Sequence, residues 1–197
     1  MVDSFISRKD RIIASAVEII SDSGLSALTT RNLALKENMS EALLYKYFGG
    51  INEVLIEVVD YYSRFDNGIR QTVKSKDGSH LQKLRDYLEA YATYYDNYYA
   101  ISTLMLQYEE LLHNIDTREK IAWCITERLN FLEDIFADAI REKEITNQFT
   151  PMELANNITG VTMAYILSRR ITYHKKTFKQ EFMEYISKWI DMLKKAE

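Results

Sequence analysis

Apolar side chains recur every three or four residues along most of this chain, a spacing typical of helices with one buried face. Residues 11–20 give the first clear case, with apolar positions at Ile12, Ile13, Ala16, Val17, Ile19 and Ile20. Gly24 is expected to end this helix. Further helices are predicted to begin at Asn52 and to run from Ser79 to about 96. Another is predicted to run to about His113, and a long one to span roughly 117–142.

Two more helices are predicted near the end of the chain. Thr150, Pro151 and Glu153 combine an N-cap, a proline at the first helical position and a capping-box glutamate. A helix of about twenty residues should follow them. The last helix is expected to run from about Lys179 to Lys195.

Residues 28–48 indicate two short helices joined by a tight turn. Thr29 and Ser40 are the expected N-caps, because a hydroxyl oxygen accepts hydrogen bonds from the N–H groups at a helix start. Asn38 falls at the turn, and asparagine tolerates the left-handed backbone conformation better than most residues. The second helix is expected to reach Phe48. Two helices with a turn of three to four residues match a helix-turn-helix.

Gly49 and Gly50 are expected to end the second helix through a positive φ angle, which glycine adopts readily. With the helix over 11–20, the two short helices make a three-helix unit in the first fifty residues. One proline and six glycines in 197 residues leave few breaks elsewhere. The expected fold is all-α with about nine helices: a helix-turn-helix domain at 1–50 and a helical ligand-binding and dimerisation domain at 51–197.

The order of these elements resembles the N-terminal domain of the tetracycline-repressor-like (TetR) transcriptional regulators. The similarity covers roughly residues 8–55, with every element in order and at the family's spacing. Three runs carry it: Arg-Ile-Ile-Ala-Ser-Ala-Val-Glu-Ile-Ile-Ser-Asp-Ser-Gly from Arg11, Leu-Thr-Thr-Arg-Asn-Leu-Ala from Leu28, and Ser-Glu-Ala-Leu-Leu-Tyr-Lys-Tyr-Phe from Ser40. The resemblance implies a homodimer that binds a near-palindromic double-stranded DNA operator, most commonly as a repressor released by a small-molecule effector.

The resemblance also implies which side chains meet DNA. The second helix of the motif places its N-terminal residues at base edges, where Glu41 suits a cytosine amino group and apolar neighbours suit a thymine methyl. Its aromatic end matches the stretch that grips the phosphate backbone, and hydroxyls at both helix starts suit phosphate. Arg31 suits either a phosphate or a base. The full expected set is Thr29, Thr30, Arg31, Ser40, Glu41, Ala42, Leu43, Tyr45, Lys46 and Tyr47.

Charge limits the strength of this DNA contact. The chain has a formal net charge of −4, and residues 1–50 hold six basic and six acidic side chains. Each phosphate contact adds a salt-dependent increment to binding, so a neutral domain has few to offer. Ile51 stands where the family commonly has a lysine, so that contact is expected to be absent. We expect modest non-specific affinity, with much of the binding coming from the paired geometry of a dimer.

Composition indicates the compartment. No run of about 18 apolar residues occurs, so no membrane span and no membrane partner are expected. The N-terminal residues lack the apolar segment of a signal peptide. The single Cys124 cannot form an internal disulfide and is expected to be a buried, small apolar residue in a reducing compartment. These features predict a cytoplasmic protein.

Five tyrosines between residues 87 and 98 recur at helical spacing on one face. A core stripe is one interpretation. Because a buried tyrosine hydroxyl needs a partner, five on one face also suit a ligand cavity. The resemblance places the effector pocket in the corresponding helices, and such walls suit an aromatic or cationic small molecule, with Glu109 as the acidic partner. The predicted lining is Tyr87, Tyr91, Tyr94, Tyr95, Tyr98, Met105, Tyr108, Glu109 and Trp123.

Small residues lie four apart on the helix that begins at Pro151. This spacing lets another helix approach closely, either from the same chain or from a second subunit. In the family that the sequence resembles, the last two helices of each subunit form the dimer interface. The predicted interface residues are Gly160, Ala164, Tyr165, Ser168, Phe182, Ile186 and Trp189.

Two other classes of protein compete with this prediction. A helical adaptor that binds only proteins leaves the segment Tyr45-Lys46-Tyr47 unexplained. An enzyme is the weaker alternative, because His80, His113 and His174 lack metal-ligand spacing. The sequence also has no glycine-rich phosphate loop, serine elbow or cysteine–histidine pair. No catalytic residue, metal or cofactor is therefore predicted.

Overall fold

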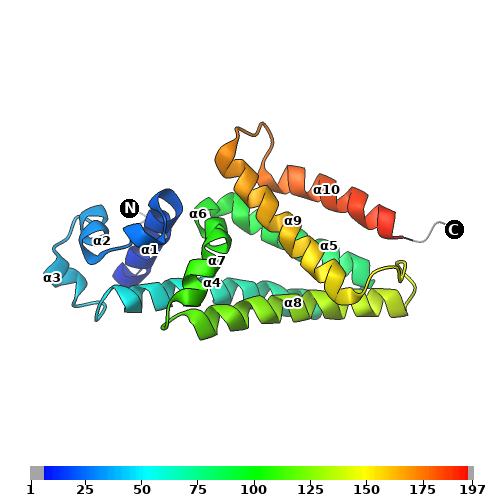
Figure 1. The fold of residues 1–197 in the computed structure, drawn as a ribbon, viewed down its shortest axis with the longest axis horizontal. Helices are drawn as coiled ribbons and strands as arrows, with labels where there is room; N and C mark the ends of the chain where they lie inside the picture. The colour runs from blue at the N-terminus through cyan, green and yellow to red at the C-terminus, as the bar shows by residue number, and fades with distance from the viewer. Residues whose placement is uncertain (1–6, 195–197) are drawn as a thin grey trace. The chain divides into compact units, whose positions relative to one another are not determined.

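The computed structural model describes residues 7–194, and every regular element in that part of the chain is helical, which confirms the all-α prediction (Figure 1). The first elements are α1 (Arg8–Ser23), the 3₁₀ segment η1 (Leu25–Ala27), α2 (Thr30–Lys36), α3 (Glu41–Leu44) and α4 (Ile51–Lys74). They are followed by α5 (His80–Asn97), α6 (Tyr99–Ser102), the 3₁₀ segment η2 (Thr103–Gln107), α7 (Tyr108–His113), α8 (Arg118–Arg141), α9 (Pro151–Ile171) and α10 (Phe178–Leu193).

The chain divides into two compact units. The first unit holds the residues up to Arg64 together with Ala100–Ala122. The second holds Phe65–Tyr99 and the residues from Trp123 onward. The long helices α4 and α8 each contribute residues to both units. Helices α1–α3 of the predicted helix-turn-helix domain lie wholly in the first unit, and the start of a ligand-binding domain at residue 51 stays a prediction.

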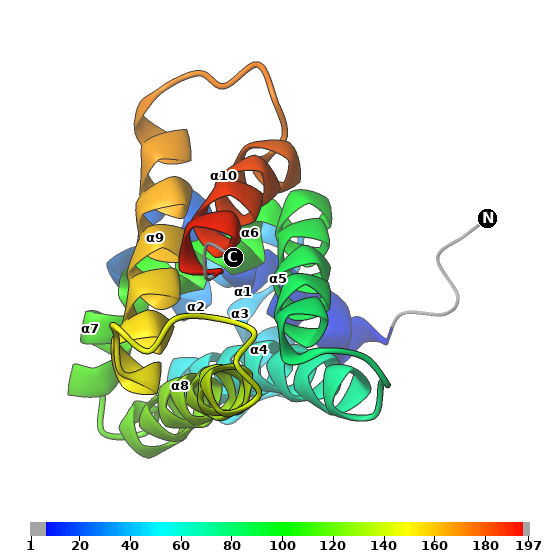
Figure 2. The same ribbon diagram turned by 90° about the vertical axis from the view of Figure 1, so that its right-hand side faces the viewer.

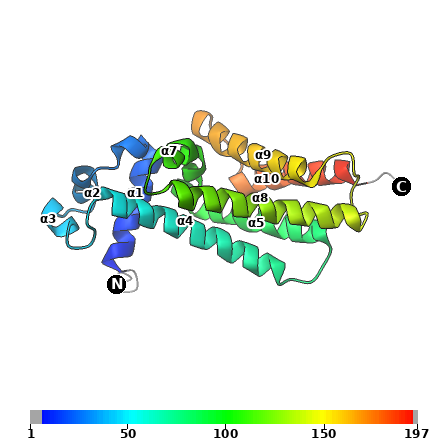
Figure 3. The ribbon, with the colours of Figure 1, turned by 60° about the horizontal axis from the view of Figure 1, so that its bottom comes forward.

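Four helices pack together in the second unit. Figure 2 shows α10 beside both α5 and α9. The carboxylate of Asp96, near the end of α5, accepts hydrogen bonds from the N–H groups of Phe178 and Lys179 at 2.9 Å each. These bonds satisfy two of the N–H groups that the start of α10 leaves without helical partners. Helix α8 runs alongside α5, where the rings of Tyr87 and Phe131 lie 4.8 Å apart (Figure 3).

The predicted N-caps are confirmed in both units. The hydroxyl oxygens of Thr29, Ser40 and Ser79 each accept a backbone hydrogen bond at the start of α2, α3 and α5. Thr150 and Glu153 form the reciprocal capping box predicted for α9. Caps depend only on residues three positions apart, so the sequence is sufficient to locate them.

The prediction that the second motif helix reaches Phe48 was wrong. Helix α3 ends at Leu44, and the N–H groups of Lys46 and Tyr47 bond to carbonyls three residues back, as in a 3₁₀ turn. The expected positive φ after this helix was also wrong, since the described glycines with positive φ are Gly24 and Gly78. The N–H of Gly49 donates instead to the carboxylate of Glu53 at 2.6 Å, which fixes the chain without a left-handed residue.

Two other boundaries differ from the prediction. Helix α4 begins at Ile51, one residue before the predicted cap, and the Asn52 side chain donates to the carboxylate of Asp116 at 2.8 Å. The helix predicted to reach His113 is broken into α6, η2 and α7, because residues Thr103–Gln107 form a tighter 3₁₀ segment. The first difference involves Asp116, which is distant in sequence, and the second depends on the local backbone conformation.

Candidate DNA-binding surface and effector site

The turn between α2 and α3 has the backbone geometry predicted for it. Asn38 has a φ of 51°, in the left-handed region. The N–H of Met39 then donates to the carbonyl of Ala34 at 2.9 Å. This bond ties the start of α3 to the end of α2, as a helix-turn-helix requires.

Apolar side chains fill the inner side of the motif. Leu33, Leu44 and Phe48 are buried. The ammonium of Lys9 lies 5.1 Å from the centre of the Phe48 ring and pairs with Glu57 at 2.6 Å. Lys9 therefore supports the core of the motif with its charge already compensated.

The predicted DNA-contact residues are at the surface of this motif. Eight of the ten are exposed, and Thr30 and Leu43 are half-buried. Tyr45 is 54% exposed and Tyr47 is 38% exposed, although large aromatic side chains usually stabilise a fold by being buried. The hydroxyl of Thr30 donates to Glu41 at 2.7 Å, which joins the start of α2 to the start of α3.

Ion pairs separate the cations of this domain into two groups. Lys9 and Lys36 are paired, with Glu57 and with Glu18 at 2.8 Å. Of the six basic residues in the domain, Arg31 and Lys46 are the two that are exposed and have no ion pair within the part of the chain that the structure describes. A count of charges in the sequence cannot show which basic side chains are paired and which are exposed. Arg8 and Arg11 are half-buried and also have no ion pair among the described residues, so the exposed, unpaired charge lies at two of the predicted contact positions.

The first turn of α4 carries an acidic residue, Glu53, two positions after Ile51. Ile51 is half-buried, and the Glu53 carboxylate accepts the N–H of Gly49. A backbone N–H that already binds a carboxylate is not available to a DNA phosphate. The N–H of Gly49 is therefore not free to bind phosphate, and the absence of a side-chain contact at Ile51 stays a prediction.

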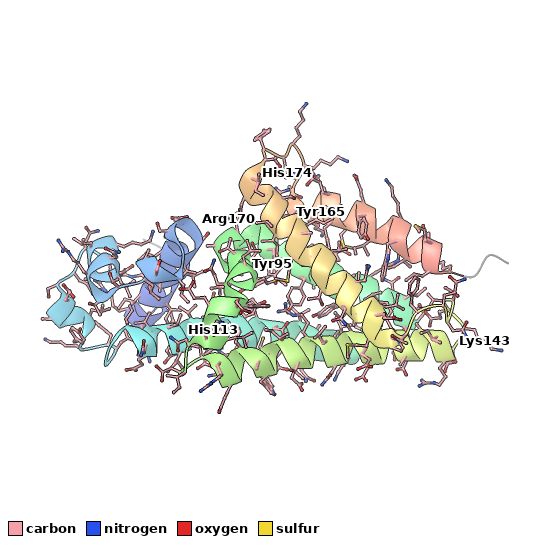
Figure 4. All side chains as sticks on the ribbon, viewed as in Figure 1. Tyr95, His113, Lys143, Tyr165, Arg170 and His174 are labelled. Atoms are coloured by element: carbon pink, nitrogen blue, oxygen red, sulfur yellow. The ribbon has the colours of Figure 1, made fainter. Side chains whose placement is uncertain are left out.

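Four of the five tyrosines predicted to share one face are on α5 and buried in the second unit: Tyr87, Tyr91, Tyr94 and Tyr95, the last labelled in Figure 4. Ring centres lie 4.9 Å apart for Tyr87 and Tyr91, and 5.5 Å apart for Tyr91 and Tyr95. Tyr98 departs from the predicted face, because it caps the end of α5 and is 54% exposed.

A buried group of charged side chains lies beside these tyrosines, and sequence analysis missed it. The side chains of Asp66, Arg70 and Arg128 are 1%, 4% and 7% exposed. Asp66 lies 3.3 Å from Arg70 on the same helix and accepts from Arg128 on α8 at 3.1 Å. Arg128 also donates to the hydroxyl of Tyr91 on α5 at 3.2 Å. The network joins three helices, and Asp66 and Arg70 at i and i+4 were its one local signal.

Two titratable groups near Asp66 are strongly affected by burial. Burial raises the pKa of the Tyr87 phenol well above its usual value, and the Asp66 carboxylate adds to this. Burial likewise raises the pKa of the Cys124 thiol to about 11, and its Sγ lies 3.8 Å from Asp66. Cys124 is buried as predicted. Both groups remain protonated and neutral at physiological pH.

The other predicted effector residues have varied surroundings. Met105 and Tyr108 are buried in the first unit, where the Tyr108 hydroxyl bonds to that of Tyr62. Glu109 is exposed and pairs with His113 at 3.0 Å. Trp123, in the second unit, is half exposed, with the Arg70 guanidinium 6.0 Å from its ring centre. The buried carboxylate beside the tyrosines is therefore Asp66.

The predicted dimer residues differ in their exposure. Gly160 and Ala164 are exposed on α9, and Ser168, Tyr165 and Trp189 are half-buried. Figure 4 labels Tyr165, whose ring packs against those of Phe178 and Phe182 in the same chain. Phe182 and Ile186 are buried within the chain, so an interface on this face has to use the other five.

Searches for two other kinds of site gave nothing in the described residues. No helix among them is long and apolar enough to cross a bilayer. No three histidine, cysteine or carboxylate side chains in residues 7–194 gather as they would around a metal ion.

Comparison with known proteins connects these features to a family. Residues 12–58 match the family described as "Bacterial regulatory proteins, tetR family". None of the curated protein sequences matches the chain. Among solved structures, the ketosteroid transcriptional regulator KstR2 of Mycobacterium tuberculosis is similar, with a TM-score of 0.86 and 16% identity, over 96% of each chain.

Two similar structures contain ligands. AibR in complex with isovaleryl coenzyme A and operator DNA has a TM-score of 0.74 and 16% identity, covering 95% of this chain and 98% of that one. The regulator FadR from Bacillus subtilis in complex with stearoyl-CoA has a TM-score of 0.65 and 18% identity, covering 88% and 95%. At these identities the structures establish a shared fold. The helix-turn-helix geometry lies within residues 12–58, the part of the chain that matches the tetR family of bacterial regulatory proteins.

Proposed function

We propose that this protein is a ligand-responsive transcriptional repressor that binds a near-palindromic DNA operator as a homodimer. The observation that carries the proposal is the α2–α3 motif, which belongs to a family of DNA-binding regulators and has exposed aromatic and unpaired basic side chains at its tip. A protein-interaction adaptor would not need this combination.

The proposed DNA contact uses each end of α3 differently. Its first residues, Glu41, Ala42 and Leu43, face base edges in the major groove. Tyr45, Lys46 and Tyr47 in the following turn contact the phosphate backbone. With Arg31 and Lys46 as the exposed unpaired cations of the domain, each subunit neutralises few phosphates, so the salt dependence of binding should be shallow.

The proposed effector binds in the second unit, along the buried tyrosines of α5. AibR and FadR, which share the fold, bind isovaleryl coenzyme A and stearoyl-CoA. Two buried guanidinium groups, of Arg70 and Arg128, lie next to the tyrosines. Asp66 pairs with both guanidinium groups and Glu127 pairs with that of Arg70, so their charge is already compensated, and the tyrosine rings favour an uncharged hydrophobic ligand.

Ligand binding releases the protein from DNA through thermodynamic linkage between the two binding equilibria. A ligand that prefers one conformation of the second unit shifts the protein toward it, and DNA affinity falls by at most the difference in the ligand's affinity for the two conformations. Helix α4, which contributes to both units, is the proposed connection. Such a regulator needs no catalysis, and since bacterial chromosomal DNA is cytoplasmic, its proposed place of action is the cytoplasm.

A gel-shift assay tests DNA binding directly. The duplexes are the intergenic DNA upstream of the protein's own gene and an unrelated sequence of equal length. Tyr45→Ala and Lys46→Ala should each weaken binding, and Lys46→Ala should lower the salt slope by about 1 because one phosphate contact is lost. The matched controls are Tyr173→Ala and Lys175→Ala, which remove an exposed tyrosine and an exposed lysine after α9. Equal loss in all four variants, or none, contradicts the proposed surface.

The dimer is tested at Gly160. A Cβ added there meets no atom within 4 Å in the single chain, so Gly160→Gln should fold normally. At a close helix–helix contact between subunits, the same side chain would separate the two helices. Gly68→Gln is the matched control, because Gly68 is also helical, exposed and without neighbours within 4 Å. Light scattering should give a dimer for the wild type and Gly68→Gln and a monomer for Gly160→Gln. A monomeric wild type refutes this part of the proposal.

A further inference from the structure

One hydrogen bond in the helix-turn-helix joins two residues that were both predicted to meet DNA. The hydroxyl of Thr30, the first residue of α2, donates to Oε2 of Glu41, the first residue of α3, at 2.7 Å. Glu41 has no other side-chain hydrogen bond or ion pair within residues 7–194. Its second oxygen, Oε1, is therefore left as an acceptor at the exposed end of α3.

The hydroxyls of Thr29, Thr30 and Ser40 differ in the hydrogen bonds that they make. The oxygens of Thr29 and Ser40 accept backbone N–H groups as N-caps, so each hydroxyl keeps its own proton to donate. The proton of Thr30 is already donated to a carboxylate. Thr29 and Ser40 thus remain suited to phosphate, and Thr30 does not donate to one while its bond to Glu41 is in place.

We infer that Thr30 is a positioning residue that holds the Glu41 carboxylate for reading a cytosine in each half of the operator. This inference rests on the proposed DNA-binding function. A glutamate side chain has three rotatable bonds, so an exposed one samples many directions. A hydrogen bond to a charged carboxylate is among the stronger kinds and restricts that sampling before DNA arrives. A carboxylate held in one place discriminates between bases better than a mobile one.

The chemistry of the major groove selects the base. A carboxylate only accepts hydrogen bonds, and cytosine presents the N4 amino group as a donor. Guanine presents N7 and O6, and thymine presents O4, which are acceptors and repel a carboxylate. Adenine also offers an amino group, but its neighbouring N7 is an acceptor and repels a carboxylate. Cytosine is therefore the more favourable partner. One C·G pair under the start of α3 is therefore the expected feature of each half-site.

Selection from a pool of random DNA duplexes tests the inference with the full-length chain. Wild type should enrich a site with cytosine at one position of each half. Thr30→Val removes the hydroxyl at nearly constant shape and should lower the preference for cytosine at that position about fivefold, leaving the other positions unchanged. Thr30→Ser keeps a hydroxyl and should restore the preference. In Glu41→Gln the preference should be lost, and adding Thr30→Val should cause no further change.

Thr29→Val is the matched control, because it removes a neighbouring hydroxyl that has no bond to Glu41. It should weaken binding to all sequences alike. If Thr30→Val behaves in the same way, with uniform weakening and an unchanged cytosine preference, Thr30 is a phosphate contact and the inference is overturned. If wild type enriches no sequence at all, the proposed DNA-binding function fails, and the inference with it. Melting temperatures of the variants show whether each is folded.

Discussion

The helix-turn-helix and the second unit place their charged groups in opposite environments. In the first, the pairs of Lys36 with Glu18 and of Lys9 with Glu57 are partly or largely exposed. In the second, Asp66 lies almost fully buried between two arginines. Exposed pairs contribute about 0–1 kcal/mol, whereas removing one partner from a buried pair costs about 3–5 kcal/mol. The exposed pairs therefore contribute little to stability, whereas the buried network controls the stability of the second unit.

Replacing Asp66 should have the largest effect on stability. In Asp66→Asn, Arg70 and Arg128 stay buried beside a neutral group, so the free energy of unfolding should fall by about 3 kcal/mol or more. Glu18→Gln, which removes the exposed pair with Lys36, should cost less than about 1 kcal/mol. Urea titration measures both. If Asp66→Asn and Glu18→Gln lower the free energy of unfolding equally, the buried and exposed ion pairs do not differ as proposed.

The reactivity of the Cys124 thiol tests whether water is excluded from the surroundings of Asp66. With a thiol pKa of about 11 instead of 9.0, the thiolate population at pH 8 is about a hundredfold lower, and burial slows access further. Ellman's reagent should therefore label Cys124 slowly in the folded protein and quickly in guanidinium chloride. Ser26→Cys adds an exposed thiol in the helix-turn-helix unit as an internal comparison. Equal labelling rates for Cys124 and the added cysteine would indicate that water reaches the interior of the second unit.

Helix caps should contribute equally in the two regions because they are local. Thr29→Ala on α2 and Thr150→Ala on α9 should each lower the free energy of unfolding by about 1 kcal/mol. Hydrogen bonds from Thr150 lower the pKa of Glu153, so its stabilising effect is complete above pH 4.5 and is lost as the pH falls through the lowered value. Thermal unfolding at pH 7 and pH 3 should show the Thr150→Ala loss shrinking in acid. A loss that is unchanged at pH 3 contradicts the assigned role of Glu153.

The smallest expected effect is at the turn of the motif. Asn38 has a positive φ, so Asn38→Ala should cost up to about 1 kcal/mol and Asn38→Gly should be close to neutral. Gly49→Ala provides the contrast, because its φ is not positive and an added Cβ lies 3.1 Å from the flexible end of Glu53. Denaturant titration ranks the three. If Gly49→Ala costs more than Asn38→Ala, the assigned backbone roles are wrong.

The sequence predicted the parts of the site that depend on near neighbours. The caps at Thr29 and Ser40 and the left-handed Asn38 are confirmed, since each depends on residues a few positions away. It failed where competing local structures are close in energy. The end of α3 tightened into a 3₁₀ turn after Leu44, and Glu53 replaced the expected glycine geometry at Gly49.

Side-chain partnerships lay beyond the sequence in both regions. The bond from Thr30 to Glu41 spans a turn, and the bond from Arg128 to Asp66 spans 62 residues. Hydrophobic periodicity assigns residues to faces, but it does not show which polar groups meet or which cations are already paired. For this reason Glu109 looked like the acidic partner of the tyrosines, whereas Asp66 is the buried carboxylate beside them.

The sequence by itself determined that this chain is helical, where most helices begin, and that residues 28–48 form a helix-turn-helix within the segment that matches the tetR family. Those properties come from periodicity, capping and turn preferences, which are interactions over three or four residues. Only the tertiary structure decided that Arg31 and Lys46 are exposed and have no ion pair within residues 7–194, that Thr30 bonds to Glu41, and that charged groups are buried among the tyrosines. These depend on which distant residues packing brings within hydrogen-bonding distance, and that is a property of the folded chain.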